Sequence, residues 1–72
     1  MDILQEIDAE RKRAKDLWPG MFKNYHEAYA VILEEVDELW DEIKKKEQDP
    51  LRIREESIQA AAMLVRLIDE LV

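Results

Sequence analysis

Apolar residues recur along the chain with the period of an α-helix, and the helix-breaking residues fall between three such segments. The single glycine lies in the pair Pro19-Gly20, and the other proline is Pro50. No stretch alternates polar and apolar residues as a half-buried strand would, and no repeat or low-complexity segment occurs. The pattern predicts an all-α chain of three helices that forms a single domain over residues 1–72.

Capping residues indicate where the first two helices begin. Asp2 is expected to cap the first helix, with Gln5 at the reciprocal position of a capping box, and this helix should run to about Trp18. Asn24 is suited to cap a second helix, which should run to about Glu47. Both helices are therefore bounded by local sequence signals.

The third helix is expected to begin with Asp49 as its N-cap and Pro50 at its first position, and to continue to the C-terminal residues. The connection before it is short, so the second and third helices should form an antiparallel hairpin. Three lysines near the end of the second helix favour the negative end of its dipole. They are Lys44, Lys45 and Lys46.

Placed at 100° per residue, the apolar side chains form a stripe on the second helix and cover about two-thirds of the circumference of the third. The stripe comprises Tyr25, Tyr29, Ile32, Val36, Leu39, Trp40 and Ile43. The arc on the third helix comprises Ile53, Ile58, Ala60, Ala61, Met63, Leu64, Val65, Leu67, Ile68 and Leu71. One neighbouring helix cannot cover so wide an arc, whereas a second subunit can. We therefore expect a helical bundle that assembles as a homodimer or homotetramer.

Composition excludes several kinds of site and partner. There is no cysteine and only one histidine, so disulfides, thiolate sites and histidine-rich zinc sites are excluded within one chain. A net charge of −7 argues against a nucleic acid polymer as partner, although a nucleotide carried with a divalent cation stays compatible. No apolar run is long enough to span a bilayer and no signal-peptide pattern is visible, so we expect a cytoplasmic protein with no membrane partner.

Several acidic residues break the apolar pattern. Glu56 lies inside the apolar arc of the third helix, where a carboxylate requires either a salt bridge to a core-facing cation or a metal. On the second helix, Glu35 and Glu38 share a face, and Val31 lies between them on the helical wheel. This places both acids at the shoulder of the apolar stripe, whereas Glu34 points further toward solvent. They form either a solvated acidic face or, together with Glu56, the oxygen ligands that Mg²⁺ prefers.

Two further residues are candidates for contact with a nucleotide. Arg11 falls in the middle of the apolar face of the first helix, where it either pairs with Glu56 or reaches a bound phosphate. Trp18 either stacks on a base or packs in the core.

The acidic run of the second helix resembles a known family motif. Residues 34–38 read Glu-Glu-Val-Asp-Glu and match the E-E-x-x-E motif of the MazG-like nucleoside triphosphate pyrophosphohydrolases. That family carries a second motif, E-x-x-D, on its next helix, and residues 56–59 read Glu-Ser-Ile-Gln at a suitable distance. The resemblance covers roughly residues 18–71.

The resemblance implies an all-α pyrophosphohydrolase that works as a dimer or a dimer of dimers. It implies hydrolysis of a nucleoside triphosphate to the monophosphate and pyrophosphate with Mg²⁺, for which Mn²⁺ can substitute. Glu35, Glu38 and Glu56 would correspond to the metal-binding acids of the family. Glu34 would be an accessory ligand or would orient the attacking water, so that Glu34 and Glu38 are the candidate catalytic residues.

The chain departs from the family pattern at Gln59, which occupies the place of the second motif's Asp. Its amide oxygen can ligate Mg²⁺ but carries no charge, so we expect one well-occupied ion in the absence of nucleotide. The chain also offers three helices where many members have four or more, so a dimer would have to complete the site. The alternative is a non-catalytic helical oligomerisation or regulatory module, in which Glu56 is only salt-bridged and the acids of the second helix are solvated.

Overall fold

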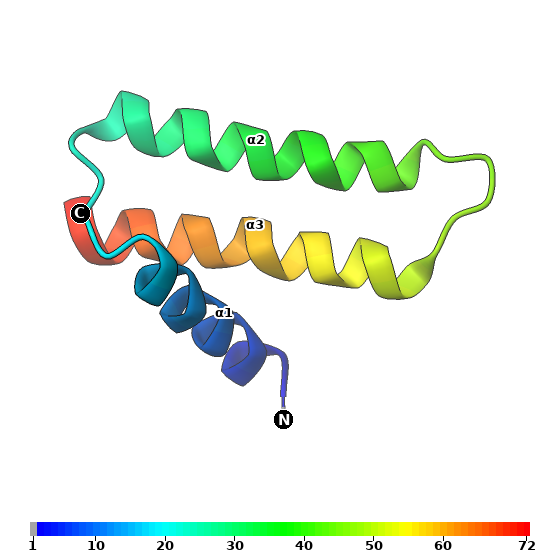
Figure 1. Ribbon diagram of the computed structural model, residues 1–72, viewed down its shortest axis with the longest axis horizontal. Helices are drawn as coiled ribbons and strands as arrows, with labels where there is room; N and C mark the ends of the chain where they lie inside the picture. The colour runs from blue at the N-terminus through cyan, green and yellow to red at the C-terminus, as the bar shows by residue number, and fades with distance from the viewer. Residues whose placement is uncertain (1) are drawn as a thin grey trace.

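This computed structural model describes residues 2–72, which form three α-helices and the connections between them (Figure 1). They are α1 (Ile3–Leu17), α2 (Tyr25–Ile43) and α3 (Pro50–Leu71). Over these residues no strand occurs, and no helix is both long enough and apolar enough to cross a lipid bilayer. The predicted all-α class with three helices is confirmed.

The side chains predicted as N-caps occupy the start of each helix. Asp2 accepts a hydrogen bond of 2.8 Å from the backbone N–H of Gln5, and the Gln5 side chain accepts one of 2.9 Å from the backbone N–H of Asp2. This reciprocal pair is the predicted capping box. Asn24 and Asp49 each accept a hydrogen bond from a backbone N–H in the first turn of α2 and α3. The predicted helix starts are therefore confirmed.

The end of α2 differs from the prediction. The helix stops at Ile43 rather than near Glu47, and Lys44 is its C-cap. The side-chain amide of Gln48 donates a hydrogen bond of 2.8 Å to the carbonyl oxygen of Ile43. A side chain thus satisfies a terminal carbonyl that another helical turn would otherwise have used. Lysines 45 and 46 lie beyond the helix, in the connection to α3.

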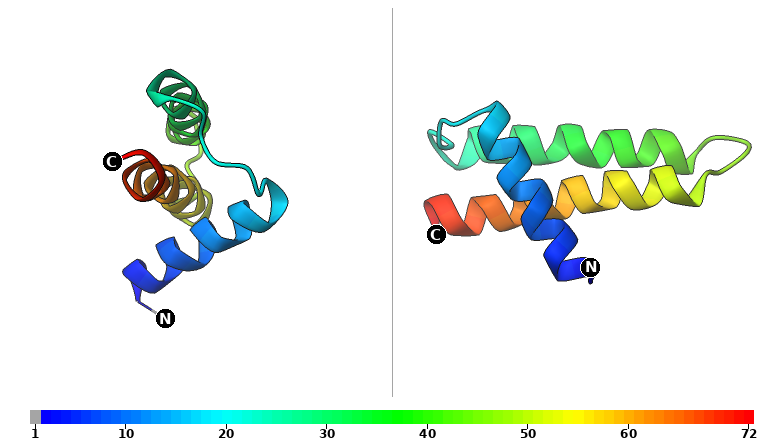
Figure 2. Two further views of the ribbon diagram at one scale, coloured as in Figure 1. Left: turned by 90° about the vertical axis from the view of Figure 1, so that its left-hand side faces the viewer. Right: turned by 60° about the horizontal axis from the view of Figure 1, so that its bottom comes forward.

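Helix α3 is the central element of the fold. As predicted, α2 and α3 lie side by side and run antiparallel (Figure 1). Helix α1 crosses α3 obliquely, and α3 packs against both other helices (Figure 2). Along the described residues, α1 and α2 do not pack against each other. They lie on different sides of α3 and leave a groove between them.

The core at the junction of the helices is built largely from small side chains. Ala28 of α2 and Ala62 of α3 expose no surface, as expected where two helices approach closely. Within the described residues, no large side chain is completely buried. The buried hydrophobic cluster comprises Ala14, Phe22, Ala28, Ile32, Ala62 and Met63. A core of this size leaves much apolar surface uncovered in a single chain.

The side of α2 that faces α3 is rotated toward the acids relative to the predicted stripe. Ile32 of the stripe is buried, but so are Ala28 and Glu42. Four members of the stripe are exposed, namely Tyr25, Tyr29, Val36 and Trp40. On α3, three members of the predicted arc are also exposed, namely Leu64, Val65 and Ile68. The arc is therefore only partly covered by α1 and α2.

Candidate metal centre

The structure brings together the three acids that the sequence placed on facing sides of the helical hairpin. Glu35 and Glu38 lie one turn apart on α2, and Glu56 projects from α3. One carboxylate oxygen from each residue lies within 4.8 Å of the other two. The cluster therefore presents three oxygen donors around one point, close enough for a small shift of side chains to surround a cation.

Glu35 and Glu56 each have one buried carboxylate oxygen with no hydrogen-bond partner among the described residues. Glu56 is only 6% exposed, Glu35 is partly buried, and Glu38 is exposed. Among residues 2–72, one oxygen of Glu35 and one oxygen of Glu56 are inaccessible to solvent and accept no hydrogen bond. A buried carboxylate oxygen without a partner is costly, and either a proton or a cation relieves that cost.

The crowding of these acids shifts their protonation equilibria. Burial, followed by repulsion from Glu38 and Glu56, raises the pKa of Glu35 above its ordinary value. Burial and repulsion from Glu38 likewise raise the pKa of Glu56, against the opposing attraction of Arg52. A divalent cation favours the ionised form of all three carboxylates, so the donor set fits a hard ion such as Mg²⁺.

Glu56 also has a cationic partner, but not the one predicted. The guanidinium of Arg52, one turn earlier on α3, donates a hydrogen bond of 3.1 Å to the other oxygen of Glu56. Arg52 is about half exposed and also pairs with Glu55 at 2.7 Å. Glu56 is therefore salt-bridged, but by a half-exposed arginine rather than by the expected core-facing cation, and one of its oxygens stays without a partner within the described residues.

The predicted pairing of Arg11 with Glu56 is wrong. Arg11 forms salt bridges with Asp8 at 2.9 Å and with Asp69 at 3.5 Å. Asp69 lies roughly 20 Å along the axis of α3 from Glu56, given a rise of about 1.5 Å per residue. Because α1 crosses α3 obliquely, Arg11 reaches the far part of α3 and is not among the residues that line the groove.

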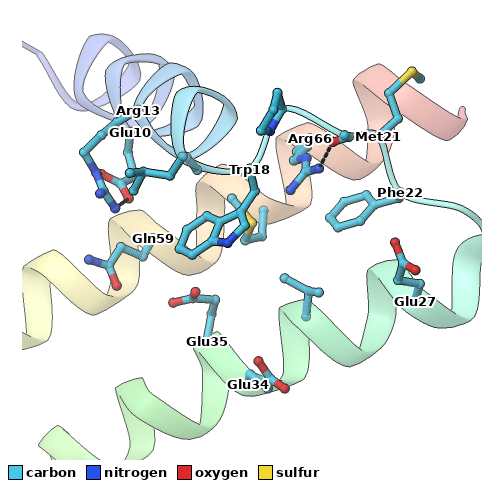
Figure 3. A pocket seen from close by; sticks show the side chains of 16 residues that line it. Glu10, Arg13, Trp18, Met21, Phe22, Glu27, Glu34, Glu35, Gln59 and Arg66 are labelled. Carbon is cyan, nitrogen blue, oxygen red and sulfur yellow. Dashed lines mark hydrogen bonds and ion pairs between the residues drawn. The ribbon is translucent and has the colours of Figure 1, made fainter.

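A groove of about 800 Å³ lies between α1 and α2, with α3 as its floor (Figure 3). Its wall includes Glu35, which thus belongs to both the acidic cluster and the groove. Glu34 and Gln59 also line it, from α2 and α3 respectively. Figure 3 shows the indole of Trp18 within the groove, in the connection after α1. Four of the sequence-predicted residues therefore meet in one cavity that opens beside the acids.

Glu42 is an acid whose burial the sequence did not predict. It is only 8% exposed, pairs with Lys45 at 2.9 Å, and adds to the charges that raise the pKa of Glu56. Its position one turn beyond Glu38 was the available signal, because residues four apart share a helix face. A further acid, in addition to Glu35 and Glu38, is thus held close enough to repel Glu56.

A buried ion pair at the other end of α3 was not predicted either. Arg66 donates a hydrogen bond of 2.6 Å to Glu70 and another of 2.6 Å to the carbonyl oxygen of Gly20, and it stacks 4.1 Å from the ring centre of Phe22. Glu70 in turn accepts a hydrogen bond of 2.7 Å from the backbone N–H of Phe22. We call this set of contacts among Arg66, Glu70, Gly20 and Phe22 the clamp. It holds the connection between α1 and α2, and this connection places Trp18 in the groove.

Hydrogen bonding has a larger combined effect than burial on the pKa of Glu70. Burial alone would raise the pKa of this carboxylate, but hydrogen bonds from Arg66, from the Phe22 backbone and from Lys15 lower it below its ordinary value. The i,i+4 spacing of Arg66 and Glu70 was the signal in the sequence. It did not reveal that the pair would be buried.

Comparisons with protein-family models, with curated proteins and with solved structures found no match to this chain.

Proposed function

We propose that this chain is a Mg²⁺-dependent pyrophosphohydrolase that converts a nucleoside triphosphate to the monophosphate and pyrophosphate. The observation that carries the proposal is the pair of buried carboxylate oxygens without partners, on Glu35 and Glu56, beside the third acid Glu38. Oxygen donors of this kind suit Mg²⁺, and Mn²⁺ accepts the same ligands. The two acidic motifs that resemble those of the MazG-like family supply the class of substrate.

Each acid has a role in this proposal. Glu35, Glu38 and Glu56 would hold the ion, whose charge would offset that of the phosphates and orient them. Glu38 is exposed, so its carboxylate is able to take a proton from an attacking water. Glu34 would orient that water or act as an accessory ligand. The water oxygen bonds to phosphorus as the bond to the departing pyrophosphate breaks, and the proton passes to the carboxylate.

The groove is suited to receive the rest of the nucleotide. Its volume of about 800 Å³ falls within the range of about 300–1,000 Å³ typical of small-molecule sites. Trp18 offers an aromatic surface for a base, and Gln59 offers a neutral amide near Glu35. In this proposal the protein acts on the nucleotide pool of the cytoplasm.

Self-association is part of the proposal, because the single chain leaves much apolar surface exposed. The accessible surface is 5410 Å², whereas a monomer of 8.6 kDa is expected to expose about 4,700 Å². The exposed apolar side chains of α2 and α3 provide a face for a second copy. Light scattering at micromolar concentration should give at least twice the mass of the chain. A stable, well-folded monomer would contradict this part of the proposal.

The activity is tested by assaying a panel of nucleoside triphosphates for pyrophosphate release with and without Mg²⁺. Glu56→Gln should lower the rate by at least about 100-fold, because charge stabilisation by a metal amounts to several kcal/mol. Glu55→Gln is the matched control, since Glu55 is an exposed neighbour that also pairs with Arg52. Equal activity in both variants would place the active site elsewhere.

The exposed apolar face also favours a second function, that of a non-catalytic helical interaction module. In that case no triphosphate would be hydrolysed, and Mg²⁺ would leave the melting temperature unchanged. A thermal melt with and without Mg²⁺ at constant ionic strength, repeated with a nucleotide, separates the two functions, because an ion that binds the native state raises the melting temperature as its concentration increases.

A further inference from the structure

The groove beside the acidic cluster is rich in negative charge. The three carboxylates of Glu35, Glu38 and Glu56 together exceed the charge of a single Mg²⁺ ion. The acids that line the groove itself are Glu10, Glu27, Glu34 and Glu35. A triphosphate that approaches this surface is repelled unless a cation of the protein faces it. A cationic side chain in the lining of the groove would offset this repulsion.

Two arginines line the groove, and they differ in accessibility. Arg66 is only 8% exposed, and its guanidinium already donates to Glu70 and to the carbonyl oxygen of Gly20. The side chain of Arg13 is 54% exposed, and over residues 2–72 its hydrogen bonds go to Glu10. Arg13 is thus the groove arginine whose guanidinium is accessible to a ligand.

Arg13 lies across the groove from Glu35 (Figure 3). It lines a second, smaller pocket together with Gln59, so the two residues flank the same region (Figure 3). The hydrogen bond to Glu10 and, to a lesser degree, the charge of Glu35 raise the pKa of Arg13. Within the described residues the guanidinium of Arg13 donates to Glu10 and not to Glu35, which leaves Glu35 open to a cation.

We infer that Arg13 binds the phosphate chain of the substrate, exchanging the carboxylate of Glu10 for phosphate oxygens. The inference rests on the proposed function and adds to it a residue from α1. The exchange is chemically conservative, because the planar guanidinium forms the same paired hydrogen bonds with a carboxylate as with a phosphate. Two contacts to Glu10, from Nε and Nη2, already hold Arg13 in that paired arrangement.

Binding of inorganic triphosphate in the presence of Mg²⁺, measured by titration calorimetry, tests this role without requiring turnover. Arg13→Gln should bind at least about ten-fold more weakly than the wild type, in keeping with the loss of charge-assisted hydrogen bonds. Lys12→Gln removes the same charge from the adjacent position, but Lys12 pairs with Asp8 and does not line the groove. This control should bind about as tightly as the wild type.

Two further variants sharpen the test. Arg13→Lys keeps the charge but loses the paired geometry, so its affinity should fall between those of the wild type and Arg13→Gln. Glu10→Gln removes the competing carboxylate and should tighten binding. In combination with Arg13→Gln, the Glu10→Gln change should have a smaller effect, because Arg13 is no longer there to be released.

The inference is overturned if Arg13→Gln binds as tightly as Lys12→Gln, or if the wild type does not bind triphosphate at all. The proposed function fails separately. If binding depends on Arg13 but no nucleoside triphosphate is hydrolysed, the phosphate site stands and the catalytic proposal does not. If hydrolysis occurs while Arg13→Gln binds normally, the catalytic proposal stands and the role of Arg13 does not.

Discussion

Glu56 and Glu70 are glutamates of the same helix, and their side chains are 8% and 6% exposed. Glu70 has a partner for each oxygen, supplied by Arg66, Lys15 and the backbone N–H of Phe22. Glu56 has Arg52 on one oxygen and no partner on the other, and it faces further acids. Their pKa values accordingly move in opposite directions, downward at Glu70 and upward at Glu56.

The contrast shows that burial of an acid does not by itself distinguish a structural role from a functional one. The hydrogen-bonding partners of the carboxylate distinguish the two roles. A buried carboxylate with all its hydrogen bonds made stabilises the fold in its ionised form, whereas one that lacks them and faces like charges is available to a cation. Replacing the glutamate with glutamine should therefore change the free energy of unfolding in opposite directions at Glu56 and Glu70.

The largest effect on stability is expected at the clamp. Glu70→Gln should lower the free energy of unfolding by about 3 kcal/mol, because it leaves the buried guanidinium of Arg66 without its charged partner. Urea unfolding at fixed protein concentration measures the change. Asp69→Asn is a suitable control, since Asp69 is exposed and makes only a longer salt bridge to Arg11. Equal stability of Glu70→Gln and the wild type would remove the distinction between the two acids.

Glu56→Gln should act in the opposite direction on the metal-free protein. Replacing a buried carboxylate that faces other acids with a neutral amide should raise the free energy of unfolding by about 1 kcal/mol. The same variant should lose the stabilisation that Mg²⁺ gives the wild type. Thermal melts with and without Mg²⁺ report both effects. A destabilised variant that still responds to Mg²⁺ would show that Glu56 is structural, like Glu70.

The stability contributions of the acidic cluster (Glu35 and Glu56) and of Glu70 should also respond oppositely to pH. Because the folded-state pKa values of Glu35 and Glu56 are raised above 4.5, the native state holds protons that the unfolded chain has released. Their contribution to stability is therefore present below pH 4.5 and is lost as the pH rises through the raised values. At Glu70 the pKa is lowered, so its contribution is present above pH 4.5 and is lost as the pH falls through the lowered value.

Urea unfolding of the metal-free protein across this pH range checks the prediction. The loss of stability on going from about pH 5 toward neutrality should be smaller in Glu56→Gln than in the wild type, since one of the raised groups no longer titrates. Saturating Mg²⁺ should also reduce it, because the ion favours the ionised acids. A slope that neither change affects would assign the pH dependence to other groups.

The smallest effect is expected at Gln59. An aspartate there restores the charge of the family motif on a side chain one methylene shorter, so affinity for Mg²⁺ should rise only severalfold, by about 1 kcal/mol, if the shorter side chain reaches the ion. Calorimetric titration with Mg²⁺ or Mn²⁺ measures the affinity and the number of sites. Unchanged affinity would assign Gln59 to the groove rather than to the metal.

Much of the fold could be read from the sequence because its signals are local. The caps at Asp2, Asn24 and Asp49 depend on hydrogen bonds within one helical turn, and each helix starts where its cap predicts. The end of α2 was misplaced, because Gln48 reaches back to a carbonyl from outside the helix. The helical period likewise placed Glu35 and Glu38 on one side of α2, and the short connection placed α3 beside them.

The roles of the arginines could not be read in this way. Arg11 and Arg13 are both on α1, and their helical positions do not reveal which one faces α2. That depends on how α1 crosses α3, which turns Arg11 toward Asp69 and Arg13 toward the groove. The pairing of Glu56 with Arg52, by contrast, has an i,i+4 spacing that the sequence does show. It was missed because the expected partner was a core-facing cation.

The sequence by itself determined three capped helices, an antiparallel hairpin and a set of acids on its facing sides, because helical period and capping operate over a few residues. The tertiary structure decided which acids are satisfied. It turned the shoulder of α2 toward α3, left one oxygen each of Glu35 and Glu56 without a partner, and enclosed Glu70 with Arg66. Each acid has an arginine four residues earlier on α3, but the remaining partners of Glu70 are Lys15 and the backbone N–H of Phe22, which are distant in the sequence. Only the packing of the three helices could therefore distinguish Glu56 from Glu70.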